Sequence, residues 1–246
     1  MASTSETGHA KNVANFDELI SFVAAYGQAY NPSKASIQLS ALQTLSAQAK
    51  SAIIAVNGAL PAYNNAIAAR DAAFAPLNKL TTRVINALKA TDTTVQVDES
   101  ARTLVRKIQG KRATPKMTEA EKQAAAAAGQ AITEISSSQL SYESRLDNFD
   151  KLIKLLAGIS LYTPNETDLT VAALTALHAE LLAKNAAVVA AAAPLSNARI
   201  ARNEVLYKTN TGLVDIATDT KTYIKSVFGA TSPQFKQVSK LAFRAV

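Results

Sequence analysis

The six residues NFDELI at positions 15–20 return almost unchanged as NFDKLI at positions 148–153. The match continues in the same order, at a nearly constant offset, through the pairs Tyr30 and Tyr162, Pro32 and Pro164, Leu42 and Leu174, Leu45 and Leu177, and Arg70 and Arg202. Chance can supply one such pair in an alanine-rich chain, but an ordered series favours a common origin. The sequence therefore predicts a tandem duplication, with helical repeat 1 at residues 15–110 and helical repeat 2 at residues 148–246.

Composition indicates that both repeats are helical. The 246-residue chain has only 8 Gly and no Trp, and much of its 48% hydrophobic content is alanine. Alanine favours helices because its side chain loses no rotamer freedom there. No stretch alternates apolar and polar residues between hairpin turns, so no sheet is expected. We predict an all-α fold, an elongated antiparallel helical bundle with long kinked helices and two tandem-duplicated halves.

Each repeat is expected to contain a short helix, a long helix and a second short helix. In repeat 1, Asn15 and Glu18 have the spacing of a capping box, so the first helix should begin at Asn15 and stop before Pro32. The last helix should span residues 98–109, with acidic residues in its first turn, basic residues in its last turn and Gly110 after its end. Helix dipoles and C-terminal caps favour this order.

The long helices are expected at residues 33–90 and 165–228. Apolar residues recur along the first of them at heptad spacing, in a stripe wider than the seam of a two-stranded coiled coil, which favours a bundle. Pro61 and Pro76 should kink or break this helix, because proline lacks the backbone N–H and clashes with the preceding turn. Pro194 lies close to the place in the second long helix that matches Pro61.

Two arginines interrupt the apolar stripes at the same place in both repeats. Burying Arg70 or Arg202 without a partner would be costly, so a structural ion pair is one explanation. The repeated aspartates of the short helices, Asp17 and Asp150, are the candidate partners. The alternative is that a kink allows each arginine to reach water.

Two segments lie outside the repeats. Residues 1–14 are polar and lack an apolar core, so we expect a disordered tail and no secretory signal. Residues 111–147 should form a basic loop followed by an alanine-rich connecting helix from Thr118. A cytoplasmic location is expected.

Basic residues gather at equivalent places near the ends of the two repeats. The net charge of +7 permits an anionic partner, because basic surfaces attract nucleic acid and anionic lipid. The candidate anion-binding residues are Arg102, Arg106, Lys107, Lys111, Arg112, Lys225, Lys236, Lys240 and Arg244. Such clusters can contact phosphates, but no recognised nucleic-acid motif accompanies them. A solvated helix face explains the same pattern.

Residues able to carry chemistry are few. The absence of Cys excludes disulfides and thiol catalysis, and the chain has only two histidines, His9 and His178. No phosphate-binding loop, metalloprotease motif or nucleophile motif occurs. His178 is interpreted as a packing residue and His9 as part of the tail. We expect no enzyme activity, no cofactor, no metal and no small-molecule substrate.

The C-terminal part of the chain carries a resemblance. SVFGATSPQFKQVSKLAF at 226–243, with SNARIARNEVLYKTNTGLVDIA at 196–217, resembles segments of uncharacterised helical proteins from bacteria. The resemblance implies a bacterial source and an all-helical fold. It implies no activity and no site residues.

Three functions fit these features. In the preferred one, the protein is a non-catalytic scaffold whose alanine-rich helix faces pack against copies of itself or another helical protein. In the second, the basic ends bind nucleic acid or an anionic membrane. In the third, the long helices insert into a membrane, although the longest apolar run, AAVVAAAAPL at 186–195, is shorter than the roughly 20 residues that a span requires.

Overall fold

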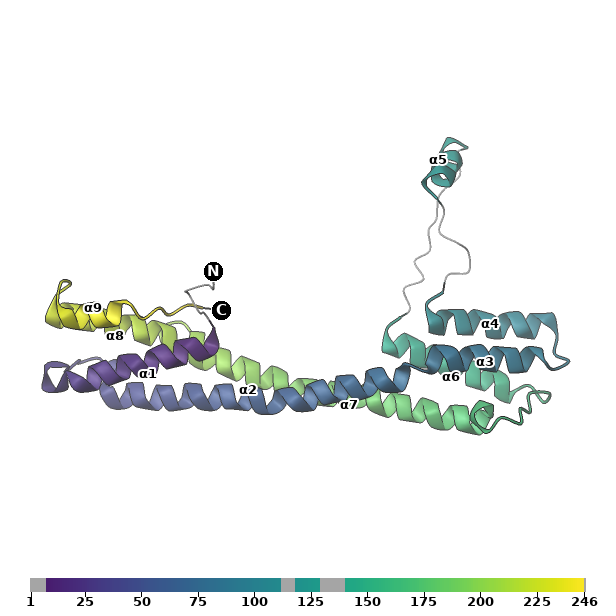
Figure 1. The fold of residues 1–246 in the computed structure, drawn as a ribbon, viewed down its shortest axis with the longest axis horizontal. Coiled ribbons are helices and arrows are strands. Elements are labelled where there is room, and N and C mark those ends of the chain that lie inside the picture. The colour runs from purple at the N-terminus through teal and green to yellow at the C-terminus, as the bar shows by residue number, and fades with distance from the viewer. Residues whose placement is uncertain (1–7, 112–117, 129–139, 246) are drawn as a thin grey trace, which may run out of the picture. The chain divides into compact units, whose positions relative to one another are not determined.

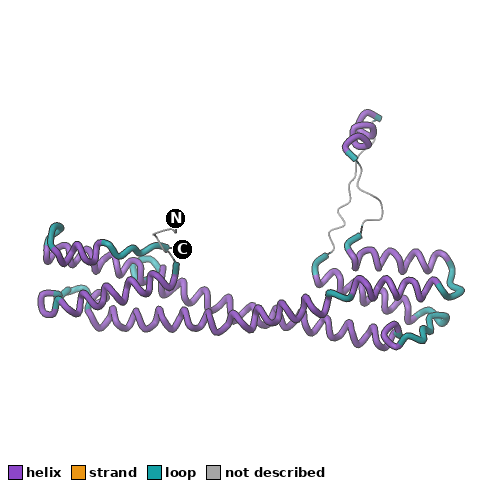
Figure 2. Tube along the Cα trace, viewed as in Figure 1, coloured by secondary structure: helices purple, strands orange, loops and turns teal. Residues whose placement is uncertain are grey.

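The computed structural model describes residues 8–111, 118–128 and 140–245. Throughout these residues the regular elements are helices and no strand occurs, which confirms the predicted all-α class (Figure 2). The chain divides into two compact units. One, the terminal unit, comprises Met1–Asn64 and Ala190–Val246, and the other, the central unit, comprises Asn65–Val189.

Both long helices contribute to both units. The unit boundaries fall within α2 (Leu39–Phe74) and within α7 (Val171–Tyr207). Each unit therefore contains the first part of one long helix and the last part of the other. The compact units cut across the two repeats, because each repeat begins in one unit and ends in the other.

The terminal unit joins the start of repeat 1 to the end of repeat 2. Its further helices are α1 (His9–Ala25), α8 (Leu213–Phe228) and α9 (Pro233–Ser239), with short 3₁₀ turns at Gly27–Ala29 and Ala35–Ile37. Helix α1 packs against α8 and α9 (Figure 1). The apolar core includes the fully buried side chains Phe16, Leu19, Leu42, Leu213, Ile224 and Val238. Burial of such side chains contributes roughly 1.5–3 kcal/mol each, which makes this core the main stabilising feature of the unit.

The central unit joins the end of repeat 1 to the start of repeat 2. Its further helices are α3 (Leu77–Lys89), α4 (Val95–Gln109), α5 (Glu119–Ala127) and α6 (Tyr142–Ala157), with a 3₁₀ turn at Thr167–Leu169. Helix α4 packs against α3 and α6 (Figure 1). The core includes the fully buried side chains Leu88, Ile108, Phe149, Leu152, Leu174 and Leu181.

Several helix ends match the sequence predictions. Helix α4 ends at Gly110, whose φ of 66° and ψ of 23° place it in the left-handed region that glycine tolerates best. Acidic Asp98 lies in the first turn of α4, and Arg106 and Lys107 lie in its last turn. Helix α9, at the place of the second short helix expected in repeat 2, begins with Pro233, and the Ser232 hydroxyl accepts a hydrogen bond from the Phe235 N–H.

The starts of the short helices differ from the prediction. Helix α1 begins at His9, so Asn15 is a buried residue inside the helix rather than its cap, and residues 9–14 are helical rather than a disordered tail. Residues 1–7 lie outside the described part of the chain. Helix α6 begins at Tyr142 with Ser141 as its cap, so it does not continue unbroken from α5. Tertiary packing of the earlier turns, such as buried Val13, extends α1 beyond its local signal.

Pro76 marks a helix break, as predicted, whereas Pro61 and Pro194 lie inside continuous helices. Helix α2 runs through Pro61 and α7 runs through Pro194, whereas α2 ends just before Pro76. Both internal prolines are exposed, so the backbone carbonyl that each leaves unpaired can bind water. The predicted single helices over 33–90 and 165–228 are therefore each divided, the second of them after Tyr207 at a place without proline.

Candidate functional site

Arg70 is the centre of a polar network in the central unit. Its guanidinium carbon lies 3.7 Å from the centroid of the Tyr142 ring, and Nη1 donates a 3.3 Å hydrogen bond to Asn185 Oδ1. Nε lies 3.7 Å from Asp71 Oδ1, and the Tyr142 hydroxyl donates to the same carboxylate at 2.6 Å. Asn185 Nδ2 donates to Glu143 Oε1 at 3.0 Å. One cation and two carboxylates are thus held together with the Arg70 side chain only 17% exposed.

These contacts shift the pKa values of two residues in the network, Tyr142 and Glu143. The hydrogen bond to Asp71 raises the pKa of Tyr142, with burial adding to the effect. The hydrogen bond from Asn185 lowers the pKa of Glu143. At neutral pH both shifts favour a protonated Tyr142, which donates to Asp71, and an ionised Glu143, which accepts from Asn185.

The two repeated aspartates have partners other than the expected arginines. Asp17 accepts a hydrogen bond from the Ser46 hydroxyl, and its carboxylate lies 2.9 Å from Lys50 Nζ. Asp150 pairs with Lys154 one helical turn later, at 2.6 Å. A nearby lysine can reach each carboxylate at lower conformational cost than a distant arginine.

Arg202 has no carboxylate within ion-pair distance among the described residues. Its Nε and Nη2 donate to the neighbouring amide oxygen Asn203 Oδ1 at 3.1 and 2.8 Å. Arg202 thus differs from Arg70, which lies beside the Asp71 carboxylate.

Arg202 lines a cavity of about 300 Å³ at the start of α1, which we call the α1 pocket. His9 and Lys11 come from α1, and α2 supplies Ile53, Val56 and Asn57. His9 Nδ1 lies 2.6 Å from the Tyr207 hydroxyl oxygen. Burial, followed by the charge of Arg202, lowers the pKa of His9 below its ordinary value. His9 was expected in a disordered tail. Its position depends on tertiary contacts, such as the one with Tyr207, which no local sequence motif predicts.

The basic residues near the end of repeat 1 lie mainly on α4. Arg102 pairs with Glu99 at 2.7 Å, and Arg106 Nη2 donates to the Thr103 hydroxyl at 2.9 Å. Lys107 is in the last turn of α4 and Lys111 follows it, while Arg112 lies outside the described residues.

The C-terminal basic residues lie on and around α8 and α9, where several hold the chain end in place. Lys221 Nζ donates to the Leu241 carbonyl at 2.9 Å, and Lys225 Nζ lies 5.7 Å from the centroid of the Phe235 ring. The backbone N–H of Arg244 donates to Asn12 Oδ1 at 3.1 Å. Lys236 lies in α9 and Lys240 directly follows it. These contacts give several of the cations a structural role.

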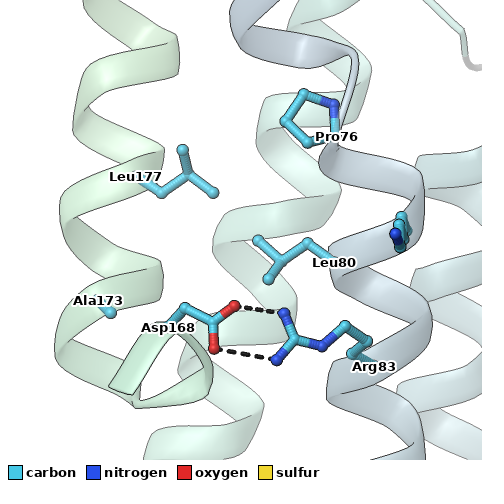
Figure 3. A pocket seen from close by; sticks show the side chains of 7 residues that line it. Pro76, Leu80, Arg83, Asp168, Ala173 and Leu177 are labelled. Carbon is cyan, nitrogen blue, oxygen red and sulfur yellow. Dashed lines mark hydrogen bonds and ion pairs between the residues drawn. The ribbon is translucent and has the colours of Figure 1, made fainter. Parts of the chain in front are cut away.

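A second cavity, of about 430 Å³, lies in the central unit (Figure 3). Leu80 and Leu177 supply apolar walls, and Arg83 faces Asp168 across its rim. The two side chains make a two-pronged ion pair, and the hydrogen bond from Arg83 lowers the pKa of Asp168. This pair was not anticipated from the sequence, because its members lie far apart along the chain. Arg83 and Asp168 neutralise each other, and Lys79 is the remaining charged residue among those that line this cavity.

His178, metal-binding groups and membrane-spanning helices were the remaining features to place. His178 packs against Phe149, with ring centroids 6.1 Å apart. Within the described ranges, no three His, Asp or Glu side chains are grouped so that they could hold a metal ion. In the same ranges, α7 alone is long and apolar enough to cross a membrane by length and composition, a test that helices of soluble proteins also pass.

No protein-family model, curated protein or solved structure matches this chain.

Proposed function

We propose that the protein is a non-catalytic scaffold that self-associates through exposed faces of its long helices. The observation that carries this proposal is a set of large apolar side chains outside both cores. On α7 in the central unit, Leu182 and Val189 are 52% and 66% exposed. They are seven residues apart and so lie on one helix face. Exposed Ala179 and Ala186 lie on the same face and leave room for the backbone of another helix.

The terminal unit has a similar feature. Ile54 on α2 and Ile200 on α7 are 68% and 59% exposed. Single exposed apolar residues are common, but apolar residues repeated along one helix face are typical of helix–helix contacts. We take a second copy of this chain as the partner.

We further propose that the chain arose by tandem duplication. Equivalent helices succeed one another in the order α1, α2, α3, α4 and α6, α7, α8, α9. One hydrogen bond also recurs, because the Tyr30 hydroxyl donates to the Ile37 carbonyl at 2.6 Å and the Tyr162 hydroxyl donates to the Leu169 carbonyl at 2.8 Å. The elongated antiparallel bundle stays a prediction, which small-angle X-ray scattering would test.

Self-association can be tested by light scattering coupled to size-exclusion chromatography over a series of protein concentrations. We expect the wild-type mass to exceed that of one chain and to fall towards it when Leu182→Glu and Val189→Glu are combined. Ala176→Glu with Ala187→Glu is the matched control, because it adds the same charge to exposed positions on another face of α7. A wild-type protein that stays monomeric at every concentration would falsify the proposal.

Membrane insertion is the second candidate, favoured by the length and apolar composition of α7. Leakage of dye from liposomes, abolished by the same Leu182→Glu and Val189→Glu pair, would support insertion. Binding of nucleic acid through the basic ends would show in the ratio of absorbance at 260 and 280 nm, because a protein without Trp absorbs weakly at 280 nm.

A further inference from the structure

Arg70 and Arg202 occupy matching places in the two repeats, but their surroundings differ in charge. Arg70 is followed by Asp71, whose carboxylate lies 3.7 Å from its Nε. Arg202 is followed by Asn203, whose amide oxygen accepts from the guanidinium in place of a carboxylate. The position after the arginine therefore carries a carboxylate in the central unit (Asp71) and a neutral amide in the terminal unit (Asn203).

The second carboxylate near Arg70, that of Glu143, also has no equivalent near Arg202. In the central unit, the pKa of Glu143 is lowered by the hydrogen bond from Asn185 and, to a smaller degree, by the charge of Arg70. Glu143 stands five residues before the motif NFDKLI, and the corresponding residue before NFDELI is Ala10. Ala10 lines the α1 pocket. The methyl group of Ala10 thus takes the place that the Glu143 carboxylate has before the second copy of the motif.

The α1 pocket is consequently positive on two sides. His9 and Lys11 line it from α1, and Arg202 lines it from α7. The wall from α2 is uncharged, and the first turn of α1 has no acidic residue. None of the described residues that line this cavity carries a carboxylate. A concave site with one sign of charge attracts a ligand of the opposite sign.

We propose that the α1 pocket binds the phosphate group of a small ligand. The Nε–Nη2 edge of Arg202 donates to Asn203, and the remaining N–H groups on Nη1 and Nη2 can donate two parallel hydrogen bonds to phosphate oxygens, with Lys11 as a further point charge. A cavity of about 300 Å³ exceeds the need of a bare phosphate ion, and Ile53 and Val56 offer apolar contact to a short organic group. The expected ligand is a small phosphate monoester, with inorganic phosphate as the minimal probe.

His9 provides the means to observe binding. The groups that face it are Arg202 and Tyr207 from α7 and Lys11 from its own helix, while α2 presents only uncharged residues. Burial and the charge of Arg202 keep its pKa low in the empty pocket. A bound phosphate dianion would favour the protonated ring and so raise the pKa of His9. An anion that remains a dianion should therefore bind more tightly as the pH falls through this pKa, whereas phosphate also takes up a proton of its own near neutral pH.

The chain has only two histidines, so imidazole NMR signals of the full-length protein give one reporter and one internal control. On titration with inorganic phosphate at constant ionic strength, we expect the His9 signals to shift to saturation and the pKa of His9 to rise. The His178 signals should not move. Sulfate, a weaker base that stays a dianion, should shift the His9 signals without the pH dependence that phosphate protonation adds.

Three variants test the assignment. Arg202→Gln should weaken phosphate binding about tenfold or more, as expected for loss of a charge-assisted hydrogen bond. Ala10→Glu with Asn203→Asp restores both carboxylates and should abolish binding, while thermal melting shows that the fold persists. Arg199→Gln is the matched control, because it removes the same charge from an exposed position of α7 outside the pocket.

An unsaturable shift, or equal weakening by Arg199→Gln and Arg202→Gln, would overturn the proposal, because either result indicates screening by bulk salt. Where binding is saturable, flotation with vesicles containing phosphatidic acid identifies the source of the phosphate. Flotation lost in Arg202→Gln assigns the pocket to a lipid headgroup. Absence of flotation assigns it to a soluble phosphate.

Discussion

At the scale of single residues, the two matched arginines differ most in what surrounds them. Arg70 is largely buried against Tyr142 and hydrogen-bonded to Asn185, so its removal leaves polar groups without partners. We expect Arg70→Ala to lower the free energy of unfolding by about 1–3 kcal/mol. Arg202→Ala should change it by less than about 0.5 kcal/mol, because its guanidinium donates hydrogen bonds to the neighbouring Asn203 side chain, which water can replace. Urea denaturation followed by circular dichroism measures both, and equal losses would contradict the difference.

His9 also makes stability depend on pH. Its pKa lies below the ordinary value of 6.5, so the unfolded chain binds a proton more readily than the folded one. The contribution of His9 to the free energy of unfolding should therefore be fully present above pH 6.5. It should be lost as the pH decreases through 6.5 towards the pKa of the folded state. The melting temperature in phosphate-free buffer should drop more in the wild type than in His9→Gln over this interval. Parallel curves for the two proteins would exclude a contribution from His9.

The repeated asparagines show how far sequence reasoning reaches at this scale. Asn15 and Asn148 hold the same place in the repeated motif, and both residues are buried. The predicted cap is wrong for Asn15, because its Nδ2 donates to the Ala242 carbonyl at 2.7 Å. Asn148 Nδ2 instead donates to the Ser144 carbonyl of its own helix. A local pattern cannot reveal the first role, since the acceptor lies at the far end of the chain.

At the scale of helices, the end of α7 shows a stop signal that contains no proline. Asn210 has a φ of 66°, its N–H donates to Asp215 Oδ2 at 2.7 Å, and the N–H of Gly212 donates to the Lys208 carbonyl at 2.7 Å. A proline is a single strong signal for a helix break. The turn after α7 instead depends on Asn210, Gly212 and Asp215 together, each of which is a weak signal alone. The sequence therefore predicted the helical class, several helix ends and the break at Pro76, whereas the division of the second long helix after Tyr207 was missed.

Two glycines provide a matched test of this turn. A Cβ atom on Gly212 would lie 2.6 Å from the Lys208 backbone nitrogen, so Gly212→Ala should force the turn open and cost about 1–3 kcal/mol. A Cβ atom on Gly58, inside α2, meets nothing within 4 Å. Gly58→Ala should therefore stabilise the protein by about 0.5–1 kcal/mol through helix propensity. Thermal melting of both variants checks the opposite signs, and a neutral Gly212→Ala would show that the turn is not closely packed.

At the scale of the whole molecule, each compact unit is assembled from both repeats. Helix α1 of repeat 1 packs against α8 and α9 of repeat 2, and α6 of repeat 2 packs against α4 of repeat 1. The repeated motif predicts two related halves, because similarity along a chain is visible in its sequence. The pairing of repeat ends is not visible there, since an apolar helix face shows that a partner is needed but not which helix supplies it.

Division of the chain between Gln130 and Ala131 should therefore separate both cores into incomplete halves. Fragment 1–130 retains α1 but lacks α8 and α9, and fragment 131–246 retains α6 but lacks α4. We expect each fragment alone to unfold cooperatively at a lower temperature or to self-associate, because a face that is buried in the intact chain is exposed. When mixed, the fragments should form a one-to-one complex with the helix content of the intact protein, measured by circular dichroism and light scattering. Two fragments that are each monomeric and stable alone would show that the repeats, rather than the exchanged units, are the folding units.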